Sequence, residues 1–390
     1  MKTAKIKVLV VSAWDGASGV LTVVRSLAEL LRDQNVTYSA FCFNGWGQGS
    51  RWASCCEHLY DNRDISLTEV LVREQFDIVH LVDTACSSAY NPNLWLRRAR
   101  YRGGIVCMSQ NTIPEVQADQ MAHVFVACSE ASRDVLAQTI SAPIRVIANG
   151  IDTDQFYVEP VEVPARPVLA WVGRADDFAQ KDIHGYLHLA ASLMNSSHDF
   201  WIADVGNNPD AFHLKDWFGE RVHYFSQLNR NQLRVFYNQV AQSGGAIIAT
   251  SVFEGFHLAL AEAAACGCPM IAPRAPGLEW IPDGKIGLVY DRYDGVQGIQ
   301  DCLDQLGHPE IRNRLVSDAQ KAVQECYNSA RMASEYYQAY QEAGQAAKAS
   351  DVEDAQARWK RRFWSEALRV RRAARRIRSR ALPSPVVQKG

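Results

Sequence analysis

The hydrophobic and polar positions of this chain alternate between two patterns. Short apolar runs of strand length are separated by longer stretches in which apolar residues recur at helical spacing, beginning with 6–11 and 20–32. Further strand-like runs are predicted at 76–81, 104–108, 124–128, 144–147, 168–172, 200–205, 222–225, 246–250, 269–272 and 287–290. Helices are predicted near 66–75, from Ser129 onward, and near 182–195, 229–242, 257–266 and 310–347. Strands alternating with helices predict parallel sheets covered on both faces.

A proline-rich stretch divides this pattern into two halves. Residues 158–167 contain three prolines and few large apolar residues, and the strand–helix alternation restarts after them. The predicted fold class is therefore α/β, with two Rossmann-like parallel-sheet domains at 1–157 and 166–330. A helix at 331–350 is expected to pack back toward the first domain, followed by a basic tail at 351–390. Two such domains face each other across a cleft, where the carboxyl ends of the strands bind ligands.

Composition narrows the class of protein. Of the 390 residues, 47% are hydrophobic and 22% charged, which is typical of an ordinary folded protein. The apolar runs are too short to span a membrane, and the first of them begins too early to leave room for a signal peptide. The ten cysteines form no CxxC motif and no pairing framework, which indicates free thiols in a reducing compartment. A cytoplasmic protein is expected.

The net charge of −2 hides a strong asymmetry. Residues 358–380 hold eleven arginine or lysine residues and one glutamate, a net charge of +10, so the rest of the chain carries −12. Arginines in 355–380 are interleaved with apolar residues, and Phe363, Val370 and Ile377 recur every seventh position. This pattern is typical of an amphipathic helix on an anionic membrane surface, which would place the protein peripherally on the inner face of a membrane. The alternative is a helix that packs on the acidic body. Nucleic acid is not expected as a partner, because nothing else in the chain is basic.

The segment from 251 to 271 carries the most informative chemistry. Glu254 and Glu262 stand eight residues apart. Eight residues of helix would leave the two carboxylates on a similar face, about 12 Å apart along the axis. Between them, the backbone N–H groups of residues 255–258 would lie at a helix N-terminus and favour an anion. Two ordinary carboxylates, one of them a helix-start charge, remain the alternative.

Five segments together resemble one known family. The segment E-G-F-H-L-A-L-A-E-A from Glu254 is similar to the E-x7-E signature of the family 4 retaining glycosyltransferases of GT-B fold, the glycosyl transferases group 1. Four others match the same family in the expected order, over about residues 5–345: V-I-A-N-G-I-D-T-D-Q-F at 146–156, V-G-R at 172–174 with Lys181, the strand at 200–206, and A-P-G-L-E-W-I-P-D-G at 275–284. The order makes this resemblance far more specific than the glutamate pair alone.

The resemblance implies a retaining, metal-independent hexosyltransferase that needs no cofactor. Its donor would be a nucleotide-diphosphate sugar, with a UDP-sugar favoured and GDP-mannose second. Arg174 and Lys181 would hold the diphosphate and stabilise the charge that grows on it. Glu254 would lie beside the donor sugar, and Glu262 would bind the ribose hydroxyls. Further donor contacts are expected from Gly19, Ser226, Leu228, Gly255, Phe256, His257 and Leu258.

Several positions depart from the family pattern. His257 stands where the family often has glycine, and a packed or solvated histidine is favoured over one that acts on the donor sugar. Gln110 and Asn111 stand where many members have a histidine near the acceptor. Because an amide is not a base at neutral pH, the acceptor proton would pass to the leaving phosphate. Asp15, Gln110 and Asn111 are the acceptor-side candidates.

Three smaller expectations concern structure rather than chemistry. Asn149–Gly150 is expected to form a turn with Asn149 in the left-handed region, and Asp152 to cap the segment after it. His80 is expected to be a structural residue. Cys266 and Cys268 are expected to be buried small side chains rather than ligands.

The expected acceptor is a glycan or glycolipid in the synthesis of cell-surface polysaccharide, lipopolysaccharide or glycolipid. Two other functions remain open from the sequence. One is a nucleotide-sugar epimerase of the same fold. The other is a non-catalytic relative that binds a nucleotide-sugar or a membrane.

Overall fold

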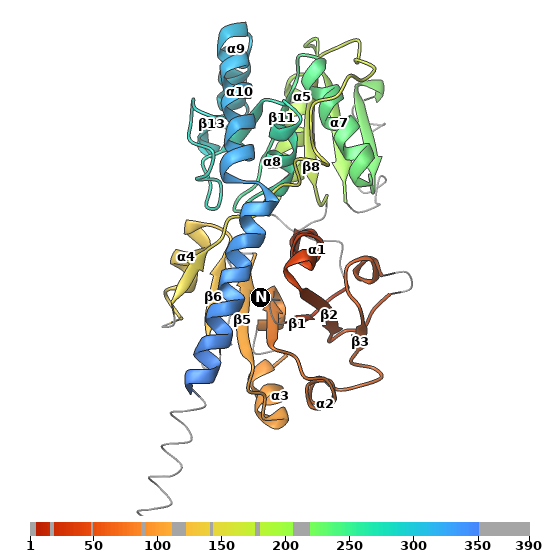
Figure 1. Ribbon diagram of the computed structural model, residues 1–390. Helices are drawn as coiled ribbons and strands as arrows, with labels where there is room; N and C mark the ends of the chain where they lie inside the picture. The colour runs from red at the N-terminus through yellow and green to blue at the C-terminus, as the bar shows by residue number, and fades with distance from the viewer. Residues whose placement is uncertain are drawn as a thin grey trace, which may run out of the picture.

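The computed structural model describes residues 5–15, 19–47, 50–86, 90–110, 122–140, 143–175, 180–205 and 219–350. They form two α/β domains stacked end to end, with helices on the faces of each sheet (Figure 1). Every strand pairing is parallel. The predicted fold class is confirmed. Among the described residues, no helix has the length and apolar character needed to cross a bilayer.

The first domain is built on a seven-stranded sheet with the order β3-β2-β1-β4-β5-β6-β7. Its central strands are buried along their whole length, as expected for a sheet covered on both faces. Its elements are β1 (Ile6–Ser12), α1 (Gly19–Leu30), β2 (Val36–Cys42), β3 (Leu59–Asp61), α2 (Leu67–Arg73), β4 (Ile78–Val82), α3 (Pro92–Ala99), β5 (Gly104–Ser109), β6 (Val124–Ala127), α4 (Glu130–Leu136) and β7 (Ile144–Val146), with 3-10 turns at Arg32–Gln34, Arg51–Ser54 and Asp83–Cys86.

The second domain has a six-stranded sheet with the order β10-β9-β8-β11-β12-β13. Its elements are β8 (Val168–Gly173), α5 (Ile183–Ser192), β9 (Asp199–Asp204), β10 (Val222–Ser226), α7 (Arg230–Gln242), β11 (Ala246–Ile248), α8 (Leu258–Ala265), β12 (Met270–Pro273), β13 (Leu288–Tyr290), α9 (Gly295–Leu306) and α10 (Pro309–Cys326), with 3-10 turns at Gly219–Arg221 and Arg292–Asp294. The predicted strands of this domain are confirmed to within two residues at each end.

The single helix predicted over 310–347 is wrong. The chain forms two helices, α10 and a second one that runs through 329–350, with a break at Tyr327–Asn328. At the break, Asn328 pairs with Ile151, whose N–H donates to the Tyr327 carbonyl at 2.7 Å. A long-range backbone pairing therefore interrupts the helix at a place that no local signal marks.

The left-handed turn predicted at Asn149–Gly150 is also wrong, because neither residue has a positive φ. Gly150 is needed for a different reason. A Cβ at this position would lie 2.5 Å from the Asn328 carbonyl oxygen, so only glycine permits this close approach. Asp152 does cap the following segment, since its Oδ1 accepts from the N–H groups of Asp154 and Gln155, both at 3.2 Å.

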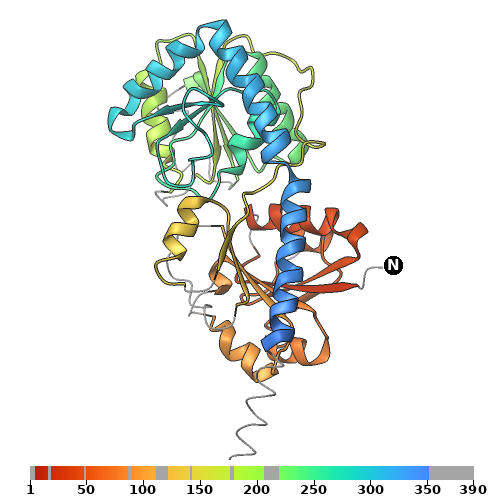
Figure 2. The same cartoon turned by 60° about the vertical axis from the view of Figure 1, so that its left-hand side comes forward.

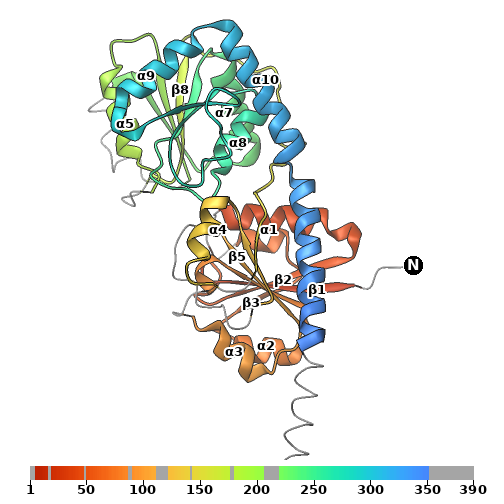
Figure 3. The same cartoon turned by 90° about the vertical axis from the view of Figure 1, so that its left-hand side faces the viewer.

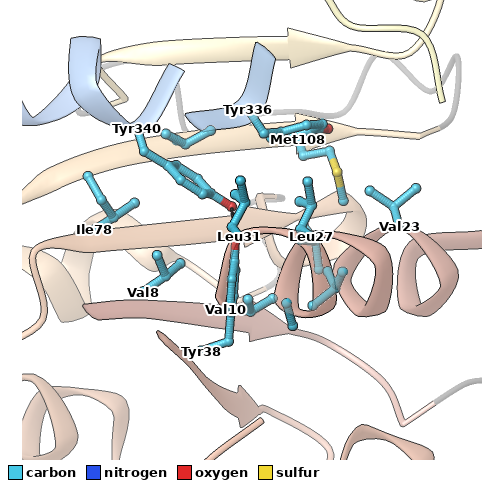
Figure 4. Close-up of a cluster of buried hydrophobic side chains, with 14 of the residues drawn as sticks. Val8, Val10, Val23, Leu27, Leu31, Tyr38, Ile78, Met108, Tyr336 and Tyr340 are labelled. Carbon is cyan, nitrogen blue, oxygen red and sulfur yellow. Dashed lines mark hydrogen bonds between the residues drawn. The ribbon is translucent and has the colours of Figure 1, made fainter. Parts of the chain in front are cut away.

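The helix over 329–350 returns from the second domain and lies along the first (Figures 2 and 3). Its buried face joins the core between the first sheet and α1 through Met332, Ala333, Tyr336, Ala339, Tyr340 and Ala343. In Figure 4, Tyr340 and Tyr38 point toward each other, and their hydroxyls lie 3.3 Å apart. The Tyr340 hydroxyl also lies 2.9 Å from Nδ1 of buried His80. Burial lowers the pKa of His80 to about 3, so His80 is neutral. It forms part of the surface on which the helix over 329–350 packs.

Candidate active site between the two domains

The two domains meet at the ends of their strands, where the start of α1 in the first domain faces the turn between β11 and α8 in the second. Gly19 begins α1 and Leu258 begins α8. A Cβ on Gly19 would lie 3.3 Å from Leu258 Cδ1, so the two helix starts are in contact range. Unpaired backbone N–H groups at both starts favour negative charge near this contact.

Two glycines allow the backbone around Glu254 to come this close to its neighbours. A Cβ on Gly255 would lie 1.9 Å from the Gln110 carbonyl oxygen, which belongs to the first domain. A Cβ on Gly277 would lie 1.8 Å from the Glu254 carbonyl oxygen, and its φ of +83° also favours glycine. The backbone before α8 is therefore held between the first domain and the segment after β12.

Glu254 is a buried carboxylate with a cation beside it. Its Oε1 lies 2.7 Å from Lys181 Nζ and accepts a hydrogen bond from the Ser251 hydroxyl at 2.5 Å. Burial alone would raise its pKa, but the Lys181 ammonium, His257 and the two hydrogen bonds outweigh burial and lower the pKa below its ordinary value. Glu254 is thus kept ionised in a site from which water is largely excluded.

His257 stands in the same site in a strained conformation. It is the N-cap of α8, with a left-handed φ of 64°, and its side chain is 3% exposed. Nε2 lies 3.8 Å from Glu254 Oε1, and Nδ1 has no hydrogen-bond partner within the described part of the chain. Burial and the nearby Lys181 lower its pKa to about 4, so His257 is neutral at physiological pH. A buried side chain agrees with the packed histidine expected from the sequence.

Glu262 lies in the second turn of α8 and has a different environment. The Tyr237 hydroxyl of α7 donates to its Oε2 at 3.1 Å. Burial raises the pKa of Glu262 to about 7, although Tyr237 and Arg230 oppose the shift. The expectation that Glu254 and Glu262 share one helical face is corrected here, because α8 starts only at Leu258 and Glu254 lies in the loop before it.

The segment after β12 supports the loop that carries Glu254. The Trp280 indole donates to the Phe256 carbonyl at 2.6 Å, and the two rings stack at 4.9 Å between centroids. The Glu279 carboxylate accepts from the Gly277 N–H at 3.0 Å. These contacts fix the direction of the N–H groups in residues 255–257.

Lys181 is positioned by side chains that the sequence analysis did not single out. The Thr250 hydroxyl lies 3.0 Å from the Lys181 carbonyl and 2.7 Å from that of Asp182. Asp182 has a positive φ of 46°, caps α5 and pairs with Arg292 at 3.0 Å. Ser251, Tyr237, Trp280 and Thr250 could be found only from the structure, since polar residues of these types occur throughout the chain.

The remaining donor-side candidates follow strand ends of the second domain. Arg174 directly follows β8, and Ser226 is the last residue of β10. Leu228 follows a left-handed Gln227 (φ 51°) and lines a pocket of about 360 Å³ together with Phe225 and Phe236. Parallel strands place these residues at the same edge of the sheet as Glu254.

The acceptor-side candidates have different surroundings. Both oxygens of Asp15 are bonded to the neighbouring loop, to the Gly47 N–H at 2.7 Å and the Ser50 hydroxyl at 2.6 Å. Gln110 accepts from Asn149 Nδ2 at 2.6 Å, while Gln110 Nε2 is buried with no partner among the described residues. Asn111 lies outside the described residues. Asp15 therefore holds a loop, and Gln110 lies at the contact between the domains.

Two further features of the site concern its cysteines and its capacity to hold a metal ion. Cys266 and Cys268 are buried, as expected for small core residues. Within the described ranges, no group of three or more His, Cys, Asp or Glu side chains could hold a metal ion.

Comparison with known proteins shows which family model the second domain matches. Residues 166–308 match the family model described as glycosyl transferases group 1. No curated protein sequence matches the chain. The predicted resemblance to this family is confirmed for the second domain, whose match contains four of the five motifs; the motif at 146–156 precedes the matched residues.

Similar solved structures cover both domains. The sucrose-phosphate synthase tll1590 of Thermosynechococcus elongatus has a TM-score of 0.70 at 17% identity, over 87% of this chain and 99% of its own. Anabaena Alr3699/HepE, solved with UDP-glucose, has a TM-score of 0.71 at 16% identity, over 86% and 99%. The lipopolysaccharide outer core galactosyltransferase WaaB has a TM-score of 0.64 at 18% identity, over 85% and 98%. At these identities the likeness shows a shared fold, that of the GT-B glycosyltransferases.

Proposed function

The second domain belongs to the glycosyl transferases group 1, and on that premise we propose that the protein transfers a hexosyl group from a nucleotide-diphosphate sugar to a hydroxyl of a glycan or glycolipid, with retention of anomeric configuration. The observation that carries this proposal is the buried Lys181–Glu254 pair at 2.7 Å, next to the contact between the domains. The Lys181 ammonium suits the anionic diphosphate of such a donor, and the Glu254 carboxylate suits the hydroxyl groups of its sugar.

The residues of the pair have separate tasks in the proposed reaction. When the donor binds, Lys181 and Arg174 contact the diphosphate and stabilise the negative charge that grows as the bond from C1 to phosphate breaks. The N–H groups of residues 255–258 add dipoles of the same sign. Glu254, kept ionised, accepts hydrogen bonds from the sugar hydroxyls and stabilises positive charge at C1.

The acceptor proton needs a base, and the described first-domain candidates do not supply one. Gln110 carries an amide, which is not basic at neutral pH, and both oxygens of Asp15 are bonded to the neighbouring loop at Gly47 and Ser50. We propose that the leaving phosphate oxygen takes the proton while the acceptor oxygen bonds to C1 on the same face. Retention follows from that geometry. Cationic side chains stabilise the leaving group, so the proposed reaction needs no metal or cofactor.

Glu262 is proposed to bind the ribose of the nucleotide, and UDP is the favoured nucleotide. A carboxylate with one hydrogen bond from Tyr237 has free lone pairs for two ribose hydroxyls. The choice of UDP is supported by the Anabaena protein, which was solved with UDP-glucose. GDP-mannose is the second candidate. A role in cell-surface polysaccharide, lipopolysaccharide or glycolipid synthesis is supported by the likeness to WaaB.

Calorimetric titration with UDP-, GDP-, ADP- and dTDP-sugars tests the donor site, with Glu262→Gln as the comparison variant. We expect one nucleotide to bind and the variant to bind it more weakly. Slow hydrolysis of the same donor would then show that C1 is activated. A donor converted to its epimer would indicate an epimerase instead. Binding without hydrolysis or epimerisation, together with failure to glycosylate a lipid-extract acceptor, would indicate a non-catalytic relative.

The basic tail is proposed to associate with anionic membrane, which would make the protein peripheral at the inner face of a membrane. The support is its charge of +10 over 358–380, interleaved with apolar residues at helical spacing. Residues 351–390 lie outside the described residues. Co-sedimentation with anionic liposomes, comparing the full chain with one that ends at Asp351, tests this proposal. Equal binding of the two chains would reject it.

A further inference from the structure

A cluster of exposed arginines lies on the first domain, at the end far from the site. Arg97 and Arg98 occupy the last turn of α3, and Arg100 and Arg102 follow in the turn that leads to β5; all four are exposed. No aspartate or glutamate occurs between residues 91 and 110. This concentration of positive charge is unusual in a body whose charge outside the basic tail is −12.

The acidic residues of the neighbouring helix have other partners. Glu69 is bonded to Ser66 in the capping box at the start of α2, and the charge of Arg73, one turn further along the helix, also acts on it. Glu74 pairs with Lys7 Nζ at 3.8 Å, and Asp77 accepts from the Lys7 N–H at 2.8 Å. The positive charge of α3 is therefore not balanced by these carboxylates.

Apolar side chains are exposed on the same two helices. Val72 of α2 is 64% exposed, and Leu94 of α3 is 38% exposed. The Arg98 guanidinium lies 5.6 Å from the centre of the Trp95 ring, so it covers an aromatic surface while its charge remains in water. Exposed apolar groups among arginines are the composition of a surface that rests on lipid headgroups.

The end of the helix over 329–350 lies beside this cluster. A Cβ on Gly104 would lie 2.8 Å from backbone atoms of Ala343 and Gly344, which places the turn from α3 to β5 against the last turns of that helix. Figures 1 and 3 show the same arrangement, with α2, α3 and this helix end at the tip of the first domain. Residues 358–380, with a charge of +10, follow only a few residues later in the chain.

Exposed arginines interleaved with exposed apolar side chains complement an anionic surface that has an apolar layer beneath it. We propose that the tip formed by Val72, Arg73, Leu94, Arg97, Arg98 and Arg100, here called the basic tip, docks on an anionic lipid surface. The basic tip consists of described residues only and does not depend on glycosyl transfer. It would orient the protein with the first domain toward the membrane and the second domain away from it.

This orientation has a consequence for the acceptor. The basic tip lies at the amino end of β5 (six residues), while Gln110 follows its carboxyl end. A strand of that length spans roughly 20 Å. A lipid-linked acceptor would therefore have to carry its reactive hydroxyl about 20 Å beyond the headgroups, on a chain of several sugar units.

The test uses the full-length protein and vesicles of phosphatidylcholine, with and without phosphatidylglycerol. Amide hydrogen exchange is measured on peptides from residues 91–104, and partition is measured by co-sedimentation for Arg97→Gln/Arg98→Gln. The matched control is Lys285→Gln/Lys321→Gln, which removes the same charge from exposed positions of the second domain. Nucleotide-sugar binding is measured on both variants to show that the site is intact.

We expect protection of 91–104 only on phosphatidylglycerol vesicles. Partition of the α3 variant should fall roughly thirtyfold, because it loses two basic residues and each contributes about 1 kcal/mol near such a surface. The control should change partition by less than about twofold. Equal partition of the two variants, or protection confined to the tail, would overturn the proposal. Equal protection of 91–104 by a DNA oligonucleotide would also overturn it, because it would indicate a nucleic-acid site. Unchanged donor binding would separate these failures from failure of the proposed function.

Discussion

Glu254 and Glu262 belong to one motif, but the protein surrounds them with opposite environments. Glu254 lies in a loop, where Lys181 from another part of the chain and Ser251 from three residues earlier contact it and keep it ionised. Glu262 lies inside α8, where Tyr237 is its bonded neighbour and burial raises its pKa to about 7. In the loop, the Lys181 ammonium can approach Glu254, whereas in the packed helix the hydrogen-bond partner of Glu262 is a side chain of α7, Tyr237. Glu254 is therefore ionised before a ligand binds, whereas Glu262 has oxygen atoms available to accept hydrogen bonds from a ligand.

The difference between the environments of Glu254 and Glu262 depends most on Lys181. Lys181→Met removes the cation and leaves a buried, uncompensated carboxylate, which should cost about 3 kcal/mol of unfolding free energy, at the low end of the range because Lys181 is 22% exposed. Because the pKa of Glu254 is lowered in the folded protein, its contribution exists above the ordinary carboxyl range and is lost as the pH falls through the folded value. Urea unfolding should therefore show a larger loss at pH 8 than at pH 4.

The double variant Lys181→Met/Glu254→Gln is the control for this effect. It removes both charges, so much of the lost stability should return. A double variant as unstable as the single one would mean that Lys181 acts through packing rather than through its charge.

A substitution at Gly255 should disturb Glu254 while leaving Glu262 unchanged. In Gly255→Ala, the new Cβ would meet the Gln110 carbonyl at 1.9 Å, so the first domain must move away from the loop. A displacement of about 1 Å at a reacting centre can cost about 100-fold in rate. We expect transfer to fall by that order while the dissociation constant of the nucleotide stays unchanged. Equal losses of nucleotide binding and transfer would contradict this separation.

Glu262→Gln should affect binding and stability in opposite directions. Loss of hydrogen bonds to a charged group should weaken nucleotide binding by about 1.5–3 kcal/mol. Because the folded pKa of Glu262 is raised to about 7, stability is lost as the pH rises from the ordinary carboxyl range through 7. The variant does not ionise, so without ligand it should be more stable than the wild type at pH 8, by about 3 kcal/mol. Calorimetry gives the affinity and thermal unfolding at pH 5 and pH 8 gives the stability. A stability difference that is independent of pH would reject the raised pKa.

The smallest effect is expected at His257, which lies between the two carboxylates in the chain. Its folded pKa of about 4 lies below the ordinary histidine value, so the folded protein loses stability as the pH falls from about 6.5 to 4. An asparagine side chain tolerates a positive φ and does not titrate in this range, so the loss should be absent from His257→Asn. The stability of the variant relative to the wild type should therefore be about 1 kcal/mol more favourable at pH 5 than at pH 7. Thermal unfolding of both proteins across this range measures it. Parallel pH profiles would mean that His257 does not titrate in this range.

The parts of the fold that the sequence missed share a physical cause. β2 and β3 were not predicted, and β2 mixes Thr37, Tyr38 and Ser39 with apolar residues; its burial comes from neighbours on both faces of the sheet. α3 was not predicted because it is short and rich in arginine. α9 was not predicted because its first turns contain two glycines. In each case, packing against the rest of the domain outweighs a weak local preference.

The residues of the candidate site also fall into two groups, those that the sequence predicted and those that it could not. Glu254, Glu262, Lys181 and Gly255 could be named from the order of motifs, because close backbone approach and charge require particular residue types. The supporting side chains could not be named. Ser251, Tyr237 and Trp280 act through single hydrogen bonds, and nothing in their sequence surroundings distinguishes them from other residues of their kinds.

By itself the sequence determined the alternation of strands and helices, the two parallel sheets, the order of the site motifs and the concentration of positive charge after residue 357. These properties depend on residue type and local spacing. The tertiary structure alone decided the ionisation of Glu254, the raised pKa of Glu262, the loop-holding role of Asp15 and the break before the helix over 329–350. Each of these depends on atoms brought from distant parts of the chain, because desolvation, charge pairing and backbone pairing act over ångströms in space rather than along the sequence.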